Sequence, residues 1–531
     1  MHAAELDQGK KSRQIVYWRQ GRMTGNVQKA VIDFLERPAT HGGAAVKRID
    51  THAATVFLTG ERALKIKRAV RFPFLDYSTL AKRKTACEAE IEVNREFAPE
   101  IYRGVLPITQ EKDGTLAIAG AGEPVEWAVE MRRFDETQTL DHLAEARRID
   151  AALADALGRS VARAHTTASV NKTARFAEQL AEIIEQNDAE LRAVPELFPT
   201  AAVNALMGAT QRALDCLHPL LAAREAAGRV AHCHGDLHLG NIVLIDGRPM
   251  LFDAIEFDRA IATGDTLYDL AFLLMDLIER GLEPAANTVL NSYLSEMRHA
   301  DNLDALAALP LFLSLRATIR AKVTAARRVN ARLRSNIDQS AREYFALAGK
   351  LLAPPAPRLI AVAGLSGTGK SLLAKALAPD VAPSPGAVVL RSDVERKALL
   401  GIAETDRLPD SAYTREITAR VYATLSDKAR CVVTAGHSAI VDAVYARAGE
   451  RAAIAQVAAG GVAFHGLFLT AELATRLARV GGRHGDASDA DVAVAREQEG
   501  YQFGAIDWIK IDAGGSPKDT LRRAKTALGL P

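Results

Sequence analysis

The stretch Gly364-Leu365-Ser366-Gly367-Thr368-Gly369-Lys370-Ser371 follows the apolar segment 359–363 and precedes a segment with helical spacing. It matches the pattern G-x-x-x-x-G-K-S between a strand and a helix. Glycines at these positions let backbone N–H groups point at phosphate oxygens, and the helix N-terminus adds the positive end of its dipole. The stretch therefore predicts a loop that binds the phosphates of ATP. The residues that we assign to ATP are Gly364, Gly367, Thr368, Gly369, Lys370 and Ser371, with the Ser371 hydroxyl also on Mg²⁺.

Around this loop the chain alternates between short apolar runs and helical segments. We expect buried strands at 359–363, 388–390, 431–434, 462–469 and 508–511. This alternation is typical of an α/β domain whose parallel sheet is covered by helices on both faces. The Pro-rich segment 353–357 cannot continue a helix, so we expect a linker there and a P-loop domain over 358–531.

Charged residues of this half suggest further parts of a phosphate-transfer site. Asp393 follows the 388–390 strand, which would place its carboxylate at the sheet edge beside the phosphate loop. It could hold metal-bound water or accept a hydroxyl proton, and it could also cap the helix that follows. Arg479 and Arg483 lie between two helices, where they could form a lid over the phosphates or belong to the solvated surface.

The first part of the chain has a different pattern of predicted strands and helices. Residues 55–67 read as two short strands, 78–97 as a helix and 127–134 as another strand, and helical spacing then runs from 140 to 352 with one β-like insertion at 243–256. These patterns predict an α+β domain over 23–352, with a strand-rich lobe before a helical lobe. Residues 1–22 show no clear periodicity, so we expect a disordered tail, and translation could also begin at Met23.

A second phosphate-transfer motif lies in this domain. It reads His234-Gly235-Asp236-Leu237-His238-Leu239-Gly240-Asn241, and after a turn at 246–247 the chain reaches Asp253. A carboxylate at a loop centre can orient and deprotonate an attacking hydroxyl, and an Asn five residues later can bind metal. A short hairpin can return a second carboxylate to the same metal. This is the H-x-D-x-x-x-x-N and D-x-x arrangement of protein-kinase-like folds.

A kinase-like nucleotide lobe needs a strand lysine and a helix glutamate that pair over the α- and β-phosphates. Lys65 has apolar neighbours on a strand, and Glu90 lies on a helical face near core positions, so we assign both to ATP. Lys67 and Glu88 are rivals, and each of these four could instead be a solvated charge. The strand at 127–134 would contact the adenine.

Two carboxylates also begin an apolar helix downstream of the loop. Asp265 and Asp269 lie four residues apart in Gly264-Asp265-Thr266-Leu267-Tyr268-Asp269-Leu270 and share one helical face. Asp265 could cap this helix.

The motif around Asp236 resembles the aminoglycoside phosphotransferase family, whose version is also H-G-D. The resemblance implies that Asp236 is the catalytic base, that Asn241 and Asp253 hold Mg²⁺, and that His234 braces the loop. It also implies that an Asp such as Asp265 supports the catalytic loop.

Residues 357–531 resemble P-loop small-molecule kinases such as gluconate and chloramphenicol kinases, and the whole chain resembles fusions of an aminoglycoside phosphotransferase with an ATP-binding domain. In the P-loop class the strand that we place at 431–434 commonly ends in an acidic residue. Here it continues Val432-Val433-Thr434-Ala435-Gly436-His437, which leaves Asp393 as the expected carboxylate.

Composition and charge restrict the function. Lys+Arg number 67 and Asp+Glu 65, so a formal charge of +2 gives no footprint for nucleic acid. We expect no membrane span and no secretory signal, and four scattered cysteines suit the cytoplasm. No G-x-G-x-x-G precedes Lys65, which disfavours a protein kinase. The sequence predicts an ATP- and Mg²⁺-dependent phosphotransferase for a hydroxylated small molecule, or an ATP sensor in which one site, more plausibly the P-loop one, transfers nothing.

Overall fold

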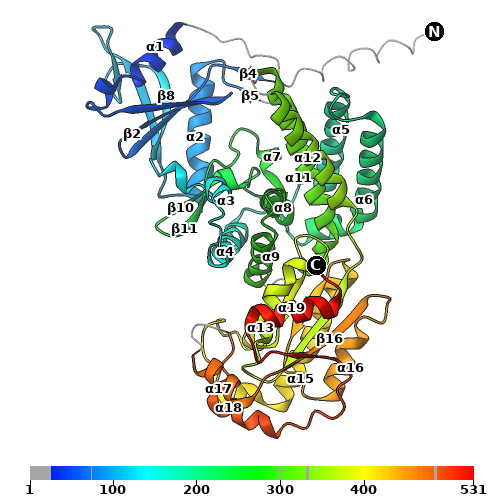
Figure 1. Ribbon diagram of the computed structural model, residues 1–531. Coiled ribbons are helices and arrows are strands. Elements are labelled where there is room, and N and C mark those ends of the chain that lie inside the picture. Colours follow the sequence, from blue (N-terminus) through cyan, green and yellow to red (C-terminus); the bar gives the residue numbers. More distant parts are fainter. Residues whose placement is uncertain (1–25, 73–74, 298–300, 331–333, 483–486) are drawn as a thin grey trace, which may run out of the picture.

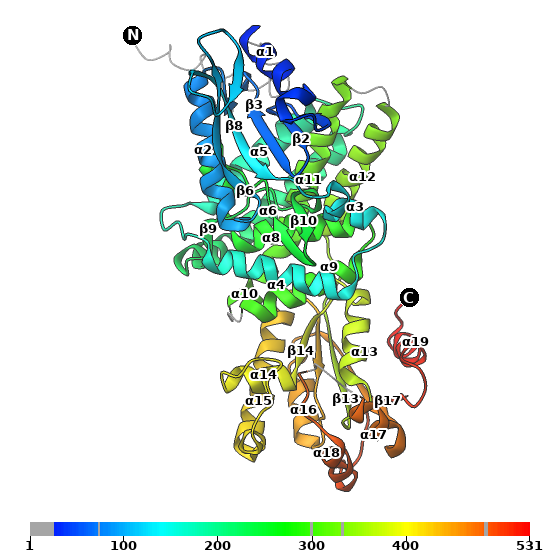
Figure 2. The same cartoon turned by 90° about the vertical axis from the view of Figure 1, so that its left-hand side faces the viewer.

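The structure is a computed structural model that describes residues 26–72, 75–297, 301–330, 334–482 and 487–531 (Figure 1). The predicted tail at 1–22 and Arg483 of the predicted lid lie outside these ranges. Among the described residues, a strand-rich lobe, a helical lobe and a separate α/β domain follow one another along the chain, and Figure 2 shows the α/β domain at the far end from the strand-rich lobe. The predicted fold class, a kinase-like α+β domain followed by an α/β P-loop domain, is confirmed.

The strand-rich lobe is a six-stranded antiparallel sheet in the order β1-β2-β3-β8-β6-β7. Ala128 of β8 packs with helix α1, whereas its neighbour Val129 packs with α2, because successive side chains of a strand point to opposite faces. The elements of this lobe are α1 (Asn26–Leu35), β1 (Val46–Asp50), β2 (Ala54–Thr59), β3 (Arg62–Lys67), β4 (Arg71–Phe72), β5 (Leu75–Asp76), α2 (Leu80–Phe97), β6 (Tyr102–Gln110), β7 (Leu116–Ile118) and β8 (Glu123–Arg132).

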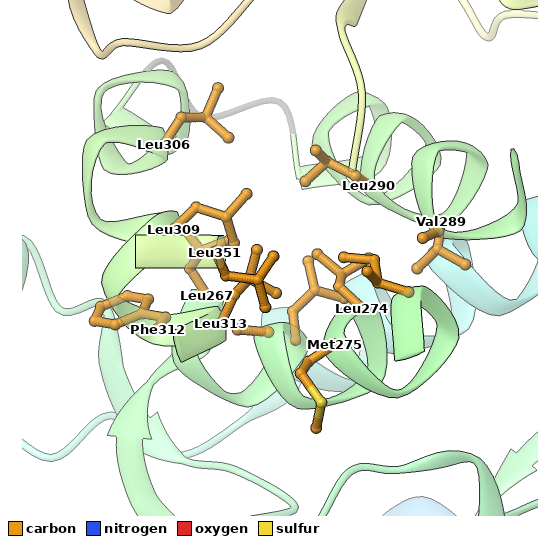
Figure 3. Packing of buried hydrophobic residues seen from close by; sticks show 14 of the residues in the cluster. Leu267, Leu274, Met275, Val289, Leu290, Leu306, Leu309, Phe312, Leu313 and Leu351 are labelled. Carbon is orange, nitrogen blue, oxygen red and sulfur yellow. The ribbon is translucent and has the colours of Figure 1, made fainter. Parts of the chain in front are cut away.

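The helical lobe is built around α8, whose residues from Thr266 to Ile278 are all buried. Leu274 of α8, Leu290 of α9 and Leu313 of α11 converge in its core (Figure 3). The helices are α3 (Leu140–Glu145), α4 (Ala151–Thr167), α5 (Phe176–Arg192), α6 (Thr200–Ala226), α7 (Arg259–Ala262), α8 (Thr266–Glu279), α9 (Glu283–Met297), α10 (Asp301–Asp304), α11 (Leu309–Ala326) and α12 (Arg334–Leu352). Short strand pairs flank the predicted catalytic loop: β9 (Val230–His232) with β12 (Thr263–Asp265), and β10 (Ile242–Ile245) with β11 (Arg248–Leu251).

The α/β domain begins with β13 at Arg358, after α12 ends at Leu352. Its sheet is parallel throughout, in the order β14-β15-β13-β16-β17, so the carboxyl ends of the strands meet at one edge. The elements are β13 (Arg358–Gly364), α13 (Lys370–Leu377), β14 (Val388–Arg391), α14 (Ser392–Leu399), α15 (Arg415–Thr434), β15 (Ala439–Asp442), α16 (Ala448–Gln456), β16 (Ala463–Thr470), α17 (Leu473–Gly481), α18 (Val492–Glu497), β17 (Ile509–Asp512) and α19 (Pro517–Leu528).

One predicted strand is wrong. Residues 431–434 form the last turn of α15, and the strand lies later, at Ala439–Asp442. Val421, Leu425 and Val432 are buried along one face of α15, so the apolar run belongs to a helical stripe. The helix ends before Gly436, whose φ of 76° suits the left-handed end of a helix. A short apolar run by itself does not distinguish a strand from a buried helix turn.

The helical lobe covers an edge of the α/β sheet. Asn287 of α9 donates from Nδ2 to the Ala387 carbonyl at 3.0 Å, and Asn291 Oδ1 accepts from the Val389 N–H at 2.7 Å. These side chains satisfy backbone groups that edge strand β14 would otherwise leave unpaired.

A run of described residues, Asn302–Ala326, is long and apolar enough to cross a membrane by composition, but 78% of its most apolar window is buried inside the protein. That degree of burial is typical of a core helix.

Candidate active sites

The predicted catalytic loop brings its base and its amide into contact. Asn241 Nδ2 donates to the backbone carbonyl of Asp236 at 3.0 Å and to its Oδ2 at 3.1 Å. These bonds use the amide nitrogen of Asn241, and its amide oxygen remains for a cation. Gly235, at φ 81°, makes the turn that precedes the base.

His238 lies against the base as well, although its sequence position did not suggest a role. Its Nε2 is 3.4 Å from Asp236 Oδ2, while its Nδ1 accepts from the Gly240 N–H at 3.1 Å. Burial would raise the pKa of Asp236, but the charge of His238 and its hydrogen bond outweigh burial and hold that pKa well below its usual range. The Asp236 carboxylate is therefore ionised at neutral pH, as a proton acceptor must be.

The nucleotide-lobe residues predicted from sequence also meet. Lys65 Nζ is 2.8 Å from Glu90 Oε1 and 2.7 Å from Asp253 Oδ1. Burial would lower the pKa of Lys65, but the charges of Asp253 and Glu90 outweigh it and raise that pKa. Asp253 has φ 59°, an unusual conformation for a residue other than glycine, and its N–H donates to the Tyr102 hydroxyl at 3.0 Å. The Asp253 carboxylate thus points toward Lys65 although the backbone conformation of Asp253 is energetically unfavourable.

The two rival residues, Lys67 and Glu88, lie in different surroundings. Lys67 Nζ lies 2.6 Å from Glu90 Oε2 and also contacts Glu256, so Glu90 pairs with both lysines. Glu88 instead is half-exposed and pairs with Lys84 on the same helix. Glu256, three residues after Asp253, is an acid with a side chain only 7% exposed that the sequence patterns do not reveal.

The supporting residues differ in part from expectation. His234 Nε2 bonds to the Phe252 carbonyl at 2.9 Å, which ties the loop to the segment before Asp253. Asp265 does not make the predicted contact with the loop: it pairs with Arg224 and caps α8 through the Leu267 N–H. The loop is held instead by Asp269, whose Oδ1 accepts from the Gly235 N–H at 2.9 Å. One further helical turn brings Asp269 to the loop, whereas the N-cap position directs Asp265 at the first turn of α8.

In the α/β domain the phosphate loop joins β13 to α13. Gly367 and Gly369 have φ of 85° and 90°. A Cβ at Gly367 would lie 2.6 Å from the Arg476 carbonyl oxygen, so glycine is required there. The Thr368 hydroxyl donates within the loop to the Leu365 carbonyl at 2.8 Å, and Lys370 Nζ donates to the same oxygen at 3.2 Å.

The acid that the sequence reasoning found missing is Asp442. It ends β15, next to β13 in the sheet, and its Oδ2 accepts from the Ser371 hydroxyl at 2.5 Å. Its sequence signal is the run Ala439-Ile440-Val441-Asp442, an apolar strand that ends in an acidic residue. The predicted strand at 431–434 occupied the place of this run in the strand order. Hydroxyl and carboxylate oxygens together form a donor set that suits Mg²⁺.

Asp393 lies in the first turn of α14, beside this pair. Burial raises its pKa, and the nearby charge of Asp442 raises it further. The capping alternative is wrong, since Arg391 occupies the N-cap position and Asp393 is already inside the helix.

The predicted lid is only partly described. Arg479 donates to the carbonyls of Ala513 at 2.9 Å and Gly515 at 2.8 Å, so it fastens the segment after β17 and does not reach toward the phosphate loop. Arg476, one helical turn earlier and not predicted, donates to the Ser366 carbonyl in that loop at 3.3 Å. Arg476 is the arginine of α17 that touches the phosphate loop.

Comparisons with known proteins agree with this division. Residues 49–309 match the phosphotransferase enzyme family, and residues 359–502 match an AAA domain. Uncharacterized proteins of Mycobacterium tuberculosis and Mycobacterium bovis are each 29% identical over 488 residues, covering 90% of this chain and 94% of the relative.

Similar solved structures each cover one part of the chain. A choline/ethanolamine kinase family protein from Mesorhizobium loti covers 61% of this chain and 95% of its own, at 15% identity and a TM-score of 0.39. A gluconokinase from Sinorhizobium meliloti covers 33% of this chain and 92% of its own, at 20% identity and a TM-score of 0.24. The family matches thus place a phosphotransferase-family domain before an AAA domain in this chain.

Proposed function

We propose that this protein is a kinase with two separate ATP·Mg²⁺ sites, each of which transfers a phosphoryl group to a hydroxyl of a small molecule in the cytoplasm. The observation that carries the proposal is the convergence of Lys65, Glu90 and Asp253 from three distant segments beside the catalytic loop. The Ser371–Asp442 contact supports the second site.

The residues of the first site fit a magnesium ion. Asn241 keeps its amide oxygen, and the Asp253 side chain is 45% exposed, so both offer the oxygen ligands that Mg²⁺ prefers. A bound ion would neutralise charge on the transferring phosphates. Lys65 would position the α- and β-phosphates, held in place by Glu90, and Asp236 would accept the proton of the attacking hydroxyl.

At the second site, Lys370 and the loop amides would hold the phosphates, and Ser371 with Asp442 would hold Mg²⁺. The raised pKa of Asp393 brings it closer to the range in which a carboxylate exchanges protons with a substrate near neutral pH. The alternative of an ATP sensor that transfers no phosphoryl group gains no support at this site, because Asp442 supplies the acidic residue that the P-loop class commonly has there.

Calorimetry with an unhydrolysable ATP analogue and Mg²⁺ tests the number of sites without knowledge of the acceptor. We expect two equivalents for the wild type, and one each for Lys65→Ala and Lys370→Ala. A single equivalent in the wild type would refute the two-site proposal.

Transfer itself is tested with labelled ATP and pooled sugars, aminoglycosides and nucleosides. Asp236→Ala should lower one transfer activity by about 10² to 10⁴ and spare the other, because a positioned base contributes that much. Unchanged transfer in this variant would show that Asp236 is not the base.

A further inference from the structure

A cavity of about 840 Å³ lies in the helical lobe, outside both proposed nucleotide sites. It is bounded by segment 169–175, the first turns of α5, the end of β9 and helix α7. None of the residues that line it belongs to the catalytic loop, the Lys65 cluster or the phosphate loop. The labels α5 and α7 locate its two helical walls in Figure 1.

The wall of this cavity contains a buried imidazole that is poorly paired. His232 is 9% exposed, and among the described residues its ring nitrogens make no hydrogen bond of ordinary geometry, with only the Ala262 backbone close enough for a weak one. Gln179, which also lines the cavity, has a buried Oε1 that no described residue bonds. A buried polar group left unpaired costs free energy, and a ligand in the cavity would supply hydrogen-bond partners to these groups.

The charges around the cavity favour an anion. Arg259 and Lys172 line it, and neither has an ion-pair partner in the described part of the chain. Arg175 is paired with Glu178 at 3.0 Å, which leaves Glu182 as the remaining acid of the lining. Two available cations therefore face one available carboxylate around this cavity.

The strand that lines the cavity continues directly into the predicted catalytic loop. The His232 N–H donates to the Ser169 carbonyl at 2.9 Å, and His232 pairs with Thr263 across the β9–β12 ladder. The next residues of the chain are Cys233 and His234, which lead directly into the loop that carries Asp236. A ligand bound to His232 would thus contact the end of β9, four residues before Asp236.

We propose that this cavity binds a small molecule through an oxyanion group, a phosphate or a carboxylate, held by Arg259, Lys172 and His232. The site is distinct from both nucleotide sites, so the proposal does not depend on which hydroxyl the kinase phosphorylates.

Calorimetry tests this on the full chain saturated with Mg²⁺ and an unhydrolysable ATP analogue, which keeps other phosphate-binding loops occupied. The two probes are inorganic phosphate and succinate, which distinguish a phosphate group from a carboxylate. We expect one of them to bind with one equivalent to the wild type. Arg259→Gln should weaken that binding by about 10- to 100-fold, the value of one charge-assisted hydrogen bond.

The matched control is Arg430→Gln, an exposed arginine on α15 that pairs with Asp427 and should leave probe binding unchanged. His232→Leu removes both ring nitrogens and should weaken binding as well, with its thermal unfolding recorded to show that it is folded. The proposal is overturned if neither probe binds the nucleotide-loaded wild type, or if Arg259→Gln binds the probe as tightly as Arg430→Gln does.

Discussion

Removing one partner of the buried ion pair between Arg224 and Asp265 should strongly destabilise the helical lobe. Their side chains are 2% and 0% exposed, and Arg224 Nε and Nη2 lie 2.6 and 2.7 Å from the two carboxylate oxygens. Asp265→Ala would leave the guanidinium buried without this carboxylate, which costs about 3–5 kcal/mol. It would also remove the α8 cap on the Leu267 N–H, about 1 kcal/mol more.

The free energy of unfolding in urea, followed by far-UV circular dichroism on the nucleotide-free protein, measures this cost. We expect Asp265→Ala to lose about 4–6 kcal/mol, a large share of the stability of an ordinary domain. Asp265→Asn should lose about 1 kcal/mol less, because Asn is also a good N-cap.

An exposed ion pair provides the control. Asp427 and Arg430 are 2.7 Å apart, with side chains 71% and 56% exposed. Asp427→Ala should cost less than about 1 kcal/mol, because solvent screens exposed pairs. If Asp265→Ala were no more destabilising than Asp427→Ala, the inference that burial makes this pair matter would be refuted.

Three further predictions concern the α/β domain. Asp442→Asn should weaken Mg²⁺·ATP binding about 10- to 100-fold, and calorimetry in EDTA should show no such loss; an equal loss without metal would argue against a metal role. Because burial and Asp442 raise the pKa of Asp393, ionising it costs stability as pH rises above the ordinary carboxyl pKa. Asp393→Asn should therefore raise the unfolding midpoint at pH 7 and change it little near pH 4, and a lower midpoint at pH 7 would contradict this. Replacing Asn287 and Asn291 together by Ala should destabilise the sheet edge by about 1–3 kcal/mol in calorimetric unfolding, and an unchanged profile would show that these bonds contribute nothing.

The motifs that were recognised in the sequence share one property. The residues of the phosphate loop, and those from His234 to Asn241, are close along the chain, so local backbone geometry alone brings them together. The pairing of Lys65 with Glu90 was also predicted, because a strand lysine and a helix glutamate follow a known spatial rule. Lys67, the rival of Lys65, also pairs with Glu90, because the alternation of side chains places Lys65 and Lys67 on the same strand face.

The residues that were missed depend on which segments become neighbours in space. Asp442 is not evident from the sequence, because the apolar run at 431–434 resembles a strand but ends helix α15, and the strand beside β13 comes later. Asp265 and Asp269 look equivalent in the sequence as supports of the predicted catalytic loop. Only the structure shows that the loop lies against Asp269. Glu256 and Arg476 gave no local signal, since their partners lie far away in sequence.

The amino-acid sequence alone determined that this protein carries two motifs typical of phosphate transfer in two domains, because each motif is a continuous peptide whose spacing dictates its shape. The tertiary structure decided which distant carboxylates lie beside those motifs. The physical reason is that such contacts depend on strand order and helix packing, which are set by the burial of side chains across the whole chain and not by any short segment.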